Sequence, residues 1–367
     1  MPDPRVTKLA KLLIHYSLEL KAGQELFLWT SPLANELNLA VIEEAIKAGA
    51  HVDVINDIPG ADEIFYKYAS DAQLDYYSPI TKMRVENFDA LLRIDAKHNT
   101  RVLSGVDPER IARYRKNSYS KFMKTYMERT AKKELNWVIT VYPTPAMAQD
   151  ADMSLSDYQE FVYGAGMLNE ENPVKFWMEE GKKQQKLIDW LKGRKQAVLK
   201  GENVDLTMSI EERIFVSANG RNNFPDGEIF TSPREDSANG WIRFRYPSIY
   251  EGQEIHDIEL WFENGKVVKE KASKNQDLLT ALLDTDAGSR FLGEWGIGTN
   301  YGIQKFTKNI LFDEKIGGTI HLAVGAGIIE AGGKNESGLH WDMICDMHNA
   351  EVTLDGDLFY KNGKPVI

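Results

Sequence analysis

The sequence predicts an α/β N-terminal domain with a mostly parallel sheet, followed by an α+β, β-rich C-terminal domain. In the first half, segments with helical spacing of apolar residues alternate with short apolar runs such as "ELFLWT" and "FDALLRIDA". Repeated βα units of this kind typically form a parallel sheet covered by helices. In the second half, apolar and polar residues alternate between turn signals, which indicates strands. The expected domains are residues 1–172 and 201–367.

The elements of the first half follow in order along the chain. "RVTKLAKLLIHYSLEL" predicts a helix, and "KAGQELFLWT" a turn and a strand. "LANELNLAVIEEAIKAGAHVDVIND" predicts a helix, a glycine-containing stop and a second strand. "FDALLRIDA" and "LNWVITVYP" predict further strands. Residues 173–200 resemble one long helix with a break or two, which we expect to connect the two domains.

The second half contains six segments with strand-like alternation and one clear helix at "NQDLLTALLD". Two of the strand segments contain Asn-Gly, in "FENGKV" and "YKNGKP". Asn-Gly between alternating runs is a strong signal for a β-hairpin turn. The other strand segments are "NVDLTMSI", "GWIRFRYPSIY", "TIHLAVGA" and "LHWDMICDM".

Composition excludes several classes of protein. The 367 residues are 43% hydrophobic and 27% charged with a formal charge of −11, which argues against a general nucleic-acid binder. The sequence contains no run of roughly 18 consecutive apolar residues, so we expect no membrane span. The first residues lack the apolar core and cleavage site of a signal peptide. The single cysteine, Cys345, cannot form an internal disulfide, so we expect a cytoplasmic protein.

A nucleotide site is not expected. The first half has no G-x-G-x-x-G between a strand and a helix. The glycine-rich "GAGIIEAGGKNES" does not match a phosphate-binding loop, because Asn335 follows Gly333-Lys334 and a strand rather than a helix comes next. Without a helix N-terminus there is no row of free N–H groups to bind the anion.

The strands around this loop carry candidate metal ligands. His340 and Asp342 lie two residues apart in "LHWDM", so they project from the same face of a strand. Such a pair can share a divalent ion, although a buried histidine hydrogen-bonded to an aspartate is the alternative. Carboxylates in apolar runs are costly to bury unless they are paired or metal-bound. Further candidates in apolar or strand-like settings are Glu228, Glu294, Glu314 and His321, a mixed set large enough for two metals that share a ligand.

At these residues the chain resembles the aminopeptidase T / aminopeptidase S family of metallopeptidases. Four motifs in the family's order carry the resemblance, which covers essentially the full length: "FPDGEIFTSP", "LGEWGIGTN", "NILFDEKIGGTIHLAVGAG" and "GLHWDM". It implies a two-domain exopeptidase, a homodimer, whose catalytic C-terminal domain holds the metals. The implied metal ligands are Glu228, Glu294, Glu314, His321, His340 and Asp342, with Glu294 bridging two ions.

One position departs from the family pattern. Members commonly carry a tyrosine seven residues after the first histidine, near the metals, and this chain has Ile328 there. Isoleucine can neither donate a hydrogen bond nor ligate a metal. The departure puts the usual activity in question and keeps a catalytically impaired binding protein as an alternative function.

The function expected from this resemblance is removal of N-terminal residues from peptides by a water that two metals activate. Zinc, cobalt and manganese suit the mixed ligands, with magnesium less favoured. Glu336 and Glu330 flank the site in sequence and could carry the proton to the leaving amine, but a solvated loop role is favoured for each. The rival hydrolytic function is cleavage of another amide or an ester, since the ligands do not set the substrate. The expected partners are peptides with a free N-terminus and a second copy of the chain, with no nucleic acid and no membrane.

Overall fold

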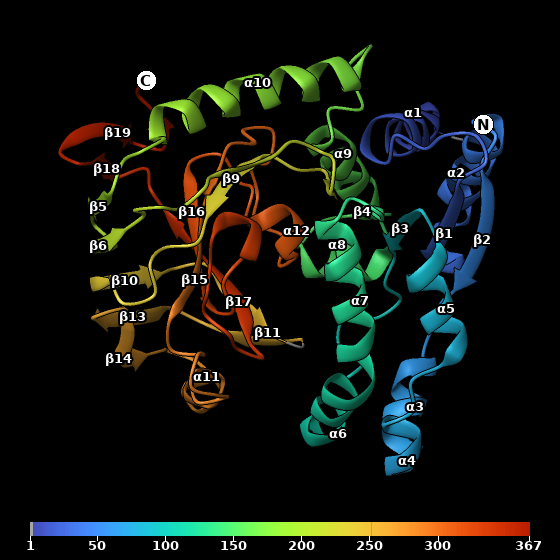
Figure 1. Cartoon of the computed structure of the whole chain (residues 1–367), viewed down its shortest axis with the longest axis horizontal. Coiled ribbons are helices and arrows are strands. Elements are labelled where there is room, and N and C mark those ends of the chain that lie inside the picture. Colours follow the sequence, from blue (N-terminus) through green and yellow to red (C-terminus); the bar gives the residue numbers. More distant parts are fainter. Residues whose placement is uncertain (1–2, 251) are drawn as a thin grey trace. The chain divides into compact units, whose positions relative to one another are not determined.

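The computed structural model describes residues 3–250 and 252–367, which form two compact units (Figure 1). Unit 1 comprises residues 1–174 together with the short segment 220–224. Unit 2 comprises residues 175–219 and 225–367. The second unit is therefore interrupted by five residues that belong to the first.

Unit 1 is an α/β structure around a five-stranded sheet in the order β2-β1-β3-β4-β8, in which all paired strands are parallel. The last strand comes from the inserted segment. The strands are β1 (Glu25–Thr30), β2 (His51–Asn56), β3 (Ala90–Asp95), β4 (Asn136–Val141) and β8 (Asn223–Phe224). The helices are α1 (Pro4–Leu12), α2 (Asn35–Lys47), α3 (Ala61–Tyr68), α4 (Asp71–Leu74), α5 (Pro79–Asn87), α6 (Pro108–Tyr114), α7 (Ser120–Ala131), α8 (Pro145–Asp150) and α9 (Leu155–Ala165).

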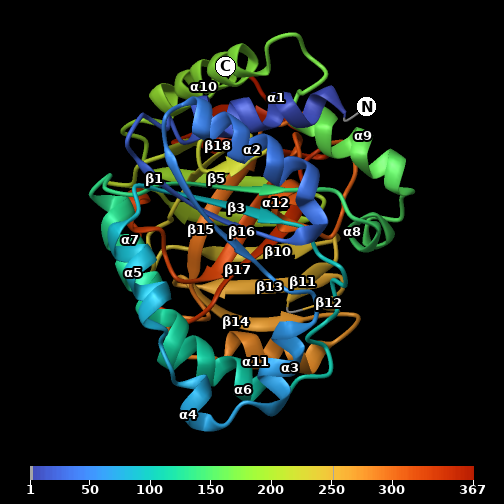
Figure 2. The same cartoon turned by 90° about the vertical axis from the view of Figure 1, so that its right-hand side faces the viewer.

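Helices lie on both faces of this sheet, as expected when parallel strands are joined by helical crossovers. Phe27 of β1 and Leu91 of β3 pack with Val85 of α5 and Phe122 of α7. Alternate residues of β1 point to the opposite face, on the side of α1 and α2 (Figures 1 and 2). The predicted α/β domain with a parallel sheet is confirmed.

Unit 2 is rich in antiparallel strands. It contains α10 (Pro173–Leu191, whose first two residues belong to unit 1), α11 (Gln276–Leu283) and α12 (Ile310–Asp313). Its strands are β5 (Gln196–Gly201), β6 (Val204–Ser209), β7 (Val216–Ala218), β9 (Glu228–Thr231), β10 (Asn239–Phe244), β11 (Ser248–Tyr250), β12 (Gln253–Ile255), β13 (Ile258–Glu263), β14 (Lys266–Lys271), β15 (Leu292–Gly298), β16 (Thr319–Gly325), β17 (His340–Asp346), β18 (Ala350–Leu354), β19 (Asp357–Lys361) and β20 (Lys364–Pro365).

Two antiparallel sheets enclose the core of unit 2. One has eight strands in the order β14-β13-β10-β6-β5-β18-β19-β20, and the other has five in the order β17-β16-β15-β9-β7. A single cluster of buried side chains draws residues from both sheets. The predicted β-rich α+β domain is confirmed, and so are both Asn-Gly hairpins, whose central residues all have positive φ: Asn264, Gly265, Asn362 and Gly363.

The predicted long helix over residues 173–200 is wrong in its last part. The helix α10 ends at Leu191, and Gly193 adopts a left-handed φ of 81°, a conformation that terminates helices. Residues 196–201 then form β5, where Ala197 and Leu199 are buried in the sheet. The sequence of this segment resembled a continuous helix, but the alternation of buried Ala197 and Leu199 with exposed or half-buried neighbours is that of a strand.

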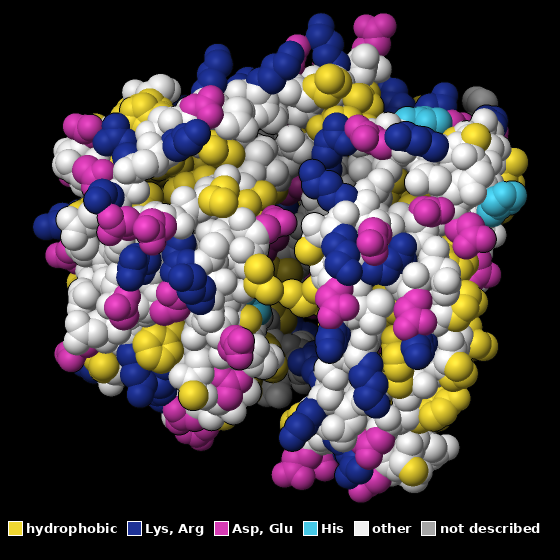
Figure 3. All heavy atoms as spheres, viewed as in Figure 1, with side chains coloured by type: hydrophobic (Ala, Val, Ile, Leu, Met, Phe, Trp, Pro, Cys, Tyr) yellow, Lys and Arg dark blue, Asp and Glu magenta, His cyan; other side chains and the backbone are white. Residues whose placement is uncertain are grey.

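The surface of the described residues carries mixed charge. Lysine and arginine side chains are interspersed with aspartate and glutamate over the face shown in Figure 3. Among residues 3–250 and 252–367, no helix is both long enough and apolar enough to cross a bilayer.

Candidate metal centre

The five-stranded sheet of unit 2 has two faces of opposite character. Trp295, Leu322 and Trp341 belong to the buried apolar cluster on one face. The residues next to them in sequence face the other way. Register pairs Glu294 with Ala323 and Ala323 with Asp342, so these three form a row across the second face. This face collects the polar residues, and the sheet presents them on rigid strands.

The same face contains glycine and alanine where larger side chains would fill the space. Gly296 lies opposite His321 in the register of β15 and β16. A Cβ on Gly296 would lie 1.9 Å from Cε1 and 2.0 Å from Nε2 of that imidazole. The ring of His321 therefore occupies the space above Gly296, and only glycine permits this position.

Both histidines direct the same ring nitrogen into the site. Nδ1 of His321 lies 3.1 Å from the backbone carbonyl of Glu314, and Nδ1 of His340 lies 2.8 Å from that of Ala326. A carbonyl can only accept, so each Nδ1 carries the proton and each Nε2 is the atom available to a metal. Hydrogen bonds of this kind, from Nδ1 to a backbone carbonyl, orient histidine side chains that bind metals.

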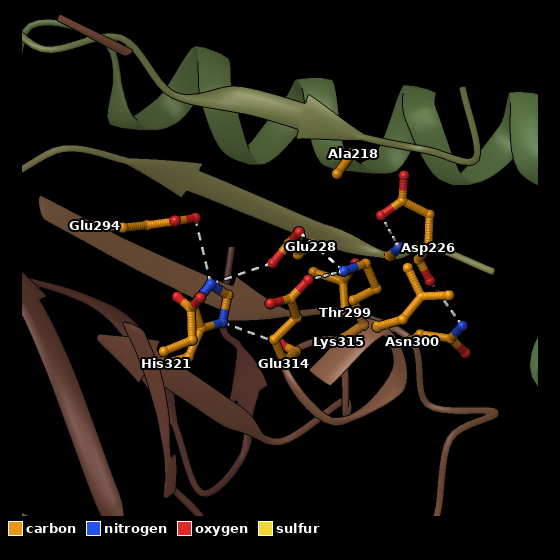
Figure 4. Close-up of polar contacts among 12 residues, drawn as sticks. Ala218, Asp226, Glu228, Glu294, Thr299, Asn300, Glu314, Lys315 and His321 are labelled. Carbon is orange, nitrogen blue, oxygen red and sulfur yellow. Dashed lines mark hydrogen bonds and ion pairs between the residues drawn. The ribbon is translucent and has the colours of Figure 1, made fainter. Parts of the chain in front are cut away.

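The two Nε2 atoms face carboxylates. Nε2 of His321 lies 3.4 Å from Oε1 of Glu294 and 3.3 Å from Oε2 of Glu228. Nε2 of His340 lies 3.1 Å from Oε2 of Glu294 and 3.6 Å from Oδ2 of Asp342. Glu294 thus contacts one histidine with each of its oxygens. Figure 4 shows the His321 ring between Glu294 and Glu228.

Three overlapping groups could each hold a cation. Their potential ligand atoms lie within 4.8 Å of one another. The structure thereby brings together all six residues that the sequence singles out. The groups are Glu228, Glu294 and His321; Glu294, His340 and Asp342; and Glu314, His321 and Asp342.

Protons on the imidazoles offset part of the negative charge of these groups when no metal ion is bound. Burial disfavours the charged form of His321, but its hydrogen bond to Glu294 and the charge of Glu228 outweigh this and raise its pKa to about 10. For His340, burial is likewise outweighed by Asp342 and Glu294, and its pKa also rises to about 10. Burial raises the pKa of Glu294, but hydrogen bonds from both imidazoles lower it more strongly. The imidazoles thus act as the cations that the carboxylates require.

Two carboxylate oxygens of the site have no hydrogen-bond donor, and a metal ion would satisfy them better than the protons of the imidazoles do. Oε2 of Glu228 and Oδ1 of Asp342 are buried and have no hydrogen-bond partner. Oε2 of Glu228 approaches His321 without the geometry of a hydrogen bond. Buried carboxylate oxygens without a donor are costly, and burial raises the pKa of both acids. A divalent ion bound by carboxylate and imidazole would satisfy these oxygens, so the residues present fit a metal.

Two residues of the site were missed from the sequence. One is Gly296, and the other is Lys315, whose fully buried ammonium contacts Glu228 and Glu314. The alternation in "GEWGIG" could have revealed the first, because Glu294, Gly296 and Gly298 share a face. The only indication of Lys315 in the sequence was its position, directly after Glu314 and before an apolar residue.

The residues of the loop before His340 lie outside the three groups. Glu330 and Glu336 are exposed, and neither belongs to a metal-binding group among the described residues. Ile328 is half-buried, and its backbone N–H donates to Oγ of Ser232 at 2.8 Å. That hydroxyl also donates to the carbonyl of Gly293 at 2.6 Å, which ties the loop to the strand that carries Glu294.

Comparison with known proteins identifies the family. The sequence pattern of the thermophilic metalloproteases (M29) matches residues 3–364, nearly the whole chain. The chain belongs to this family. The resemblance found in the four motifs and the predicted enzyme class, a metal-dependent peptidase, are thereby confirmed, and use of divalent metal follows from the family.

Similar proteins are named as aminopeptidases. Aminopeptidase AmpS of Bacillus subtilis (strain 168) is 29% identical over 72% of this chain and 74% of its own length. Aminopeptidase 2 of Geobacillus stearothermophilus is 27% identical over 99% of this chain and 95% of its own length. Among solved structures, AmpT from Thermus thermophilus has a TM-score of 0.87 at 24% identity and covers 99% of both chains. A 2,5-dihydroxypyridine dioxygenase from Pseudomonas putida KT2440 has a TM-score of 0.57 at 15% identity, covering 98% of this chain and 96% of its own.

The space above Gly296 can be tested directly. Gly296→Ala should displace the imidazole of His321 and lower peptidase activity by roughly 100-fold, since a shift of about 1 Å in a catalytic group costs that much. Hydrolysis of a peptide substrate by the purified variant measures the effect. The matched control is Gly164→Ala in α9, where a Cβ meets nothing within 4 Å. Wild-type activity in folded Gly296→Ala would contradict the described position of His321.

Proposed function

We propose that this protein is an aminopeptidase that removes N-terminal residues from peptides and holds two divalent metal ions in the site described above. The observation that carries the proposal is the convergence of two Nε2 atoms and four carboxylates, three of them on one sheet face and the fourth, Glu314, at the end of α12. The named activities of the relatives supply the reaction and the peptide substrates. The proposed ions are zinc, cobalt or manganese, which suit mixed imidazole and carboxylate ligands better than magnesium does.

Glu294 is the proposed bridging ligand. Its two oxygens point to different histidines, Oε1 to His321 and Oε2 to His340. It also belongs to two of the three possible groups, one with Glu228 and the other with Asp342. A carboxylate in this position can serve two ions at once, one through each oxygen.

The reaction needs a nucleophile, a polarised carbonyl and a means of selecting the N-terminus. Divalent ions held by these carboxylates and imidazoles would supply an acidified water and polarise the carbonyl of the scissile bond. The chain's carboxylates hold the ions and can also bind the positively charged α-amino group of a peptide, which confines cleavage to the first bond. The backbone carbonyls of Glu314 and Ala326 keep the two imidazoles in one tautomer throughout.

The proposed assembly is a homodimer located in the cytoplasm. Support for the dimer comes from unit 1, where α3 has no buried residue. Exposed apolar side chains continue along residues 58–80: Ile58 (73% exposed), Ile64 (63%), Tyr68 (79%), Tyr76 (62%) and Ile80 (56%). Apolar surface of this density is typical of a protein–protein contact.

Metal removal is the first test. An aminoacyl reporter with a free α-amino group should be hydrolysed by the purified protein, and a chelator should abolish hydrolysis. Adding zinc, cobalt or manganese should restore it, because the ligand set binds each of them. An N-acetylated reporter is the control and should resist cleavage. Chelator-resistant activity, or equal cleavage of the acetylated reporter, would refute a metal-dependent aminopeptidase. A parallel set of esters distinguishes the rival hydrolase.

Removal of the proposed bridge is the second test. Glu294→Ala should lower turnover by at least roughly 1,000-fold, about 4 kcal/mol of transition-state stabilisation, because both ions lose a ligand. Turnover and metal content of the purified variant are measured together, with circular dichroism to verify folding. Glu263→Ala, at the exposed end of β13, is the matched control. Two bound metals with unchanged turnover in Glu294→Ala would exclude the bridging role.

The third test concerns the family tyrosine that this chain lacks. Ile328→Tyr should increase turnover, since a phenol near the metals can donate a hydrogen bond to the developing oxyanion, a contact worth roughly 100- to 1,000-fold elsewhere. The Ile328→Phe variant has a side chain of nearly the same shape as tyrosine but no hydroxyl. It therefore separates the effect of hydrogen-bond donation from the effect of packing. The measurement is turnover of a leucyl substrate at saturating metal. Equal rates for all three folded proteins would show that position 328 has no catalytic role here.

A further inference from the structure

Lys315 is a fully buried lysine beside the metal centre, and the reaction described so far gives it no role. Burying an ammonium group is costly unless it is paired. The carboxylates of Glu228 and Glu314 both contact the ammonium, so Lys315 is a paired internal cation.

The ammonium of Lys315 contacts only one carboxylate oxygen of each of its two glutamate partners. Nζ lies 3.4 Å from Oε1 of Glu228 and also contacts Oε1 of Glu314. Oε2 of Glu228 points instead towards Nε2 of His321, at 3.3 Å. Figure 4 shows dashed lines from the ammonium to both carboxylates, with the ammonium on the side of Glu228 away from the His321 ring. One oxygen of each glutamate is thus engaged with lysine, and the other is left for a different cation.

The backbone holds Lys315 in this place. Its carbonyl accepts from the N–H of Asn300 at 3.0 Å, just beyond the end of β15. A Cβ on Gly298 would lie 2.1 Å from the carbonyl oxygen of Ile316, so a glycine is required for this close approach. The preceding carbonyl, that of Glu314, is the one that orients His321. Two consecutive residues therefore supply a ligand, the anchor of a second ligand and the internal cation.

We propose that Lys315 is a positioning residue of the metal centre, which fixes Glu228 and Glu314 so that each presents a single oxygen to the metals. The proposal rests on the proposed function, because it assumes that these glutamates bind metal. It adds a residue that touches no substrate and acts only through the ligands. The charge of Lys315 also offsets one of the four clustered carboxylates before any metal binds.

Metal affinity alone cannot test this role. Removing the ammonium eliminates its repulsion of a divalent ion, which strengthens binding. It also frees two carboxylates to rotate, which weakens binding. These effects have opposite signs, whereas the coordination of the bound ion and the turnover at saturating metal both depend on ligand orientation.

The experiment compares the Co²⁺-loaded wild type with Lys315→Met, which keeps the length and removes the charge. The visible absorption spectrum of Co²⁺ should change because the two glutamates can then bind with both oxygens. At saturating Co²⁺, kcat should fall by roughly 10- to 100-fold, the usual effect of losing a residue that orients metal ligands. KM should change little, since Lys315 is buried behind the ligands. Lys308→Met is the matched control, because Lys308 pairs with Glu254 outside the site.

The outcomes separate this inference from the proposed function. If the wild type binds no Co²⁺, the metal centre itself is refuted. If Lys315→Met binds Co²⁺ with the wild-type spectrum and kcat, only the positioning role is refuted. Should that variant not fold, a crystal structure of the metal-loaded wild type decides. Nζ should still contact one oxygen of Glu228 and one of Glu314, and loss of both contacts would overturn the proposal.

Discussion

The crowding of four carboxylates and two imidazoles, all but Glu314 on one face of an antiparallel sheet, is the constraint on which the structure of unit 2 depends. The four carboxylates repel one another unless cations, such as protonated imidazoles or metal ions, lie between them. The sheet can hold them together because its opposite face is anchored in the apolar core through residues such as Trp295 and Trp341. Rigid strands resist the movements by which repelled side chains would otherwise separate. The core thus stabilises an arrangement of side chains that is unfavourable by itself.

Much of this arrangement could be predicted from local sequence. Strand alternation placed His340 and Asp342 together and Trp341 on the opposite face, as the structure has them. The hairpins followed from Asn-Gly, whose conformational preference is local. The metal-binding roles of the six residues stay predictions that await the experiments above.

The features that could not be predicted depend on contacts between distant residues. Gly296 matters because β16 places His321 opposite it, and that register is not visible in either strand alone. Lys315 is significant only once Glu228, far away in sequence, lies beside it. Residues 196–200 resembled a helix in part because one of their partner strands, β18, lies far along the chain. The expected domain boundaries likewise could not anticipate that residues 220–224 join the first unit.

The fold does not determine the chemistry by itself. A dioxygenase and an aminopeptidase both share this chain's overall fold, with TM-scores of 0.57 and 0.87. What a protein of this fold does depends on the side chains that its strands present. In this chain the decisive set is anionic and imidazole-containing, and its histidines are oriented by main-chain carbonyls that no substitution of a side chain removes.

The short strand β8 determines how many times the polypeptide passes between the two units. The chain passes between the units at residues 174–175, 219–220 and 224–225. A fragment that ends at residue 174 would lose β8 and leave the edge of β4 with unpaired main-chain donors and acceptors, a surface prone to aggregation. Unit 2 alone would contain a gap where the five residues leave it. The two units are therefore not separable modules, and a recombination or circular permutation that moves one without the other must cut the chain at more than one place.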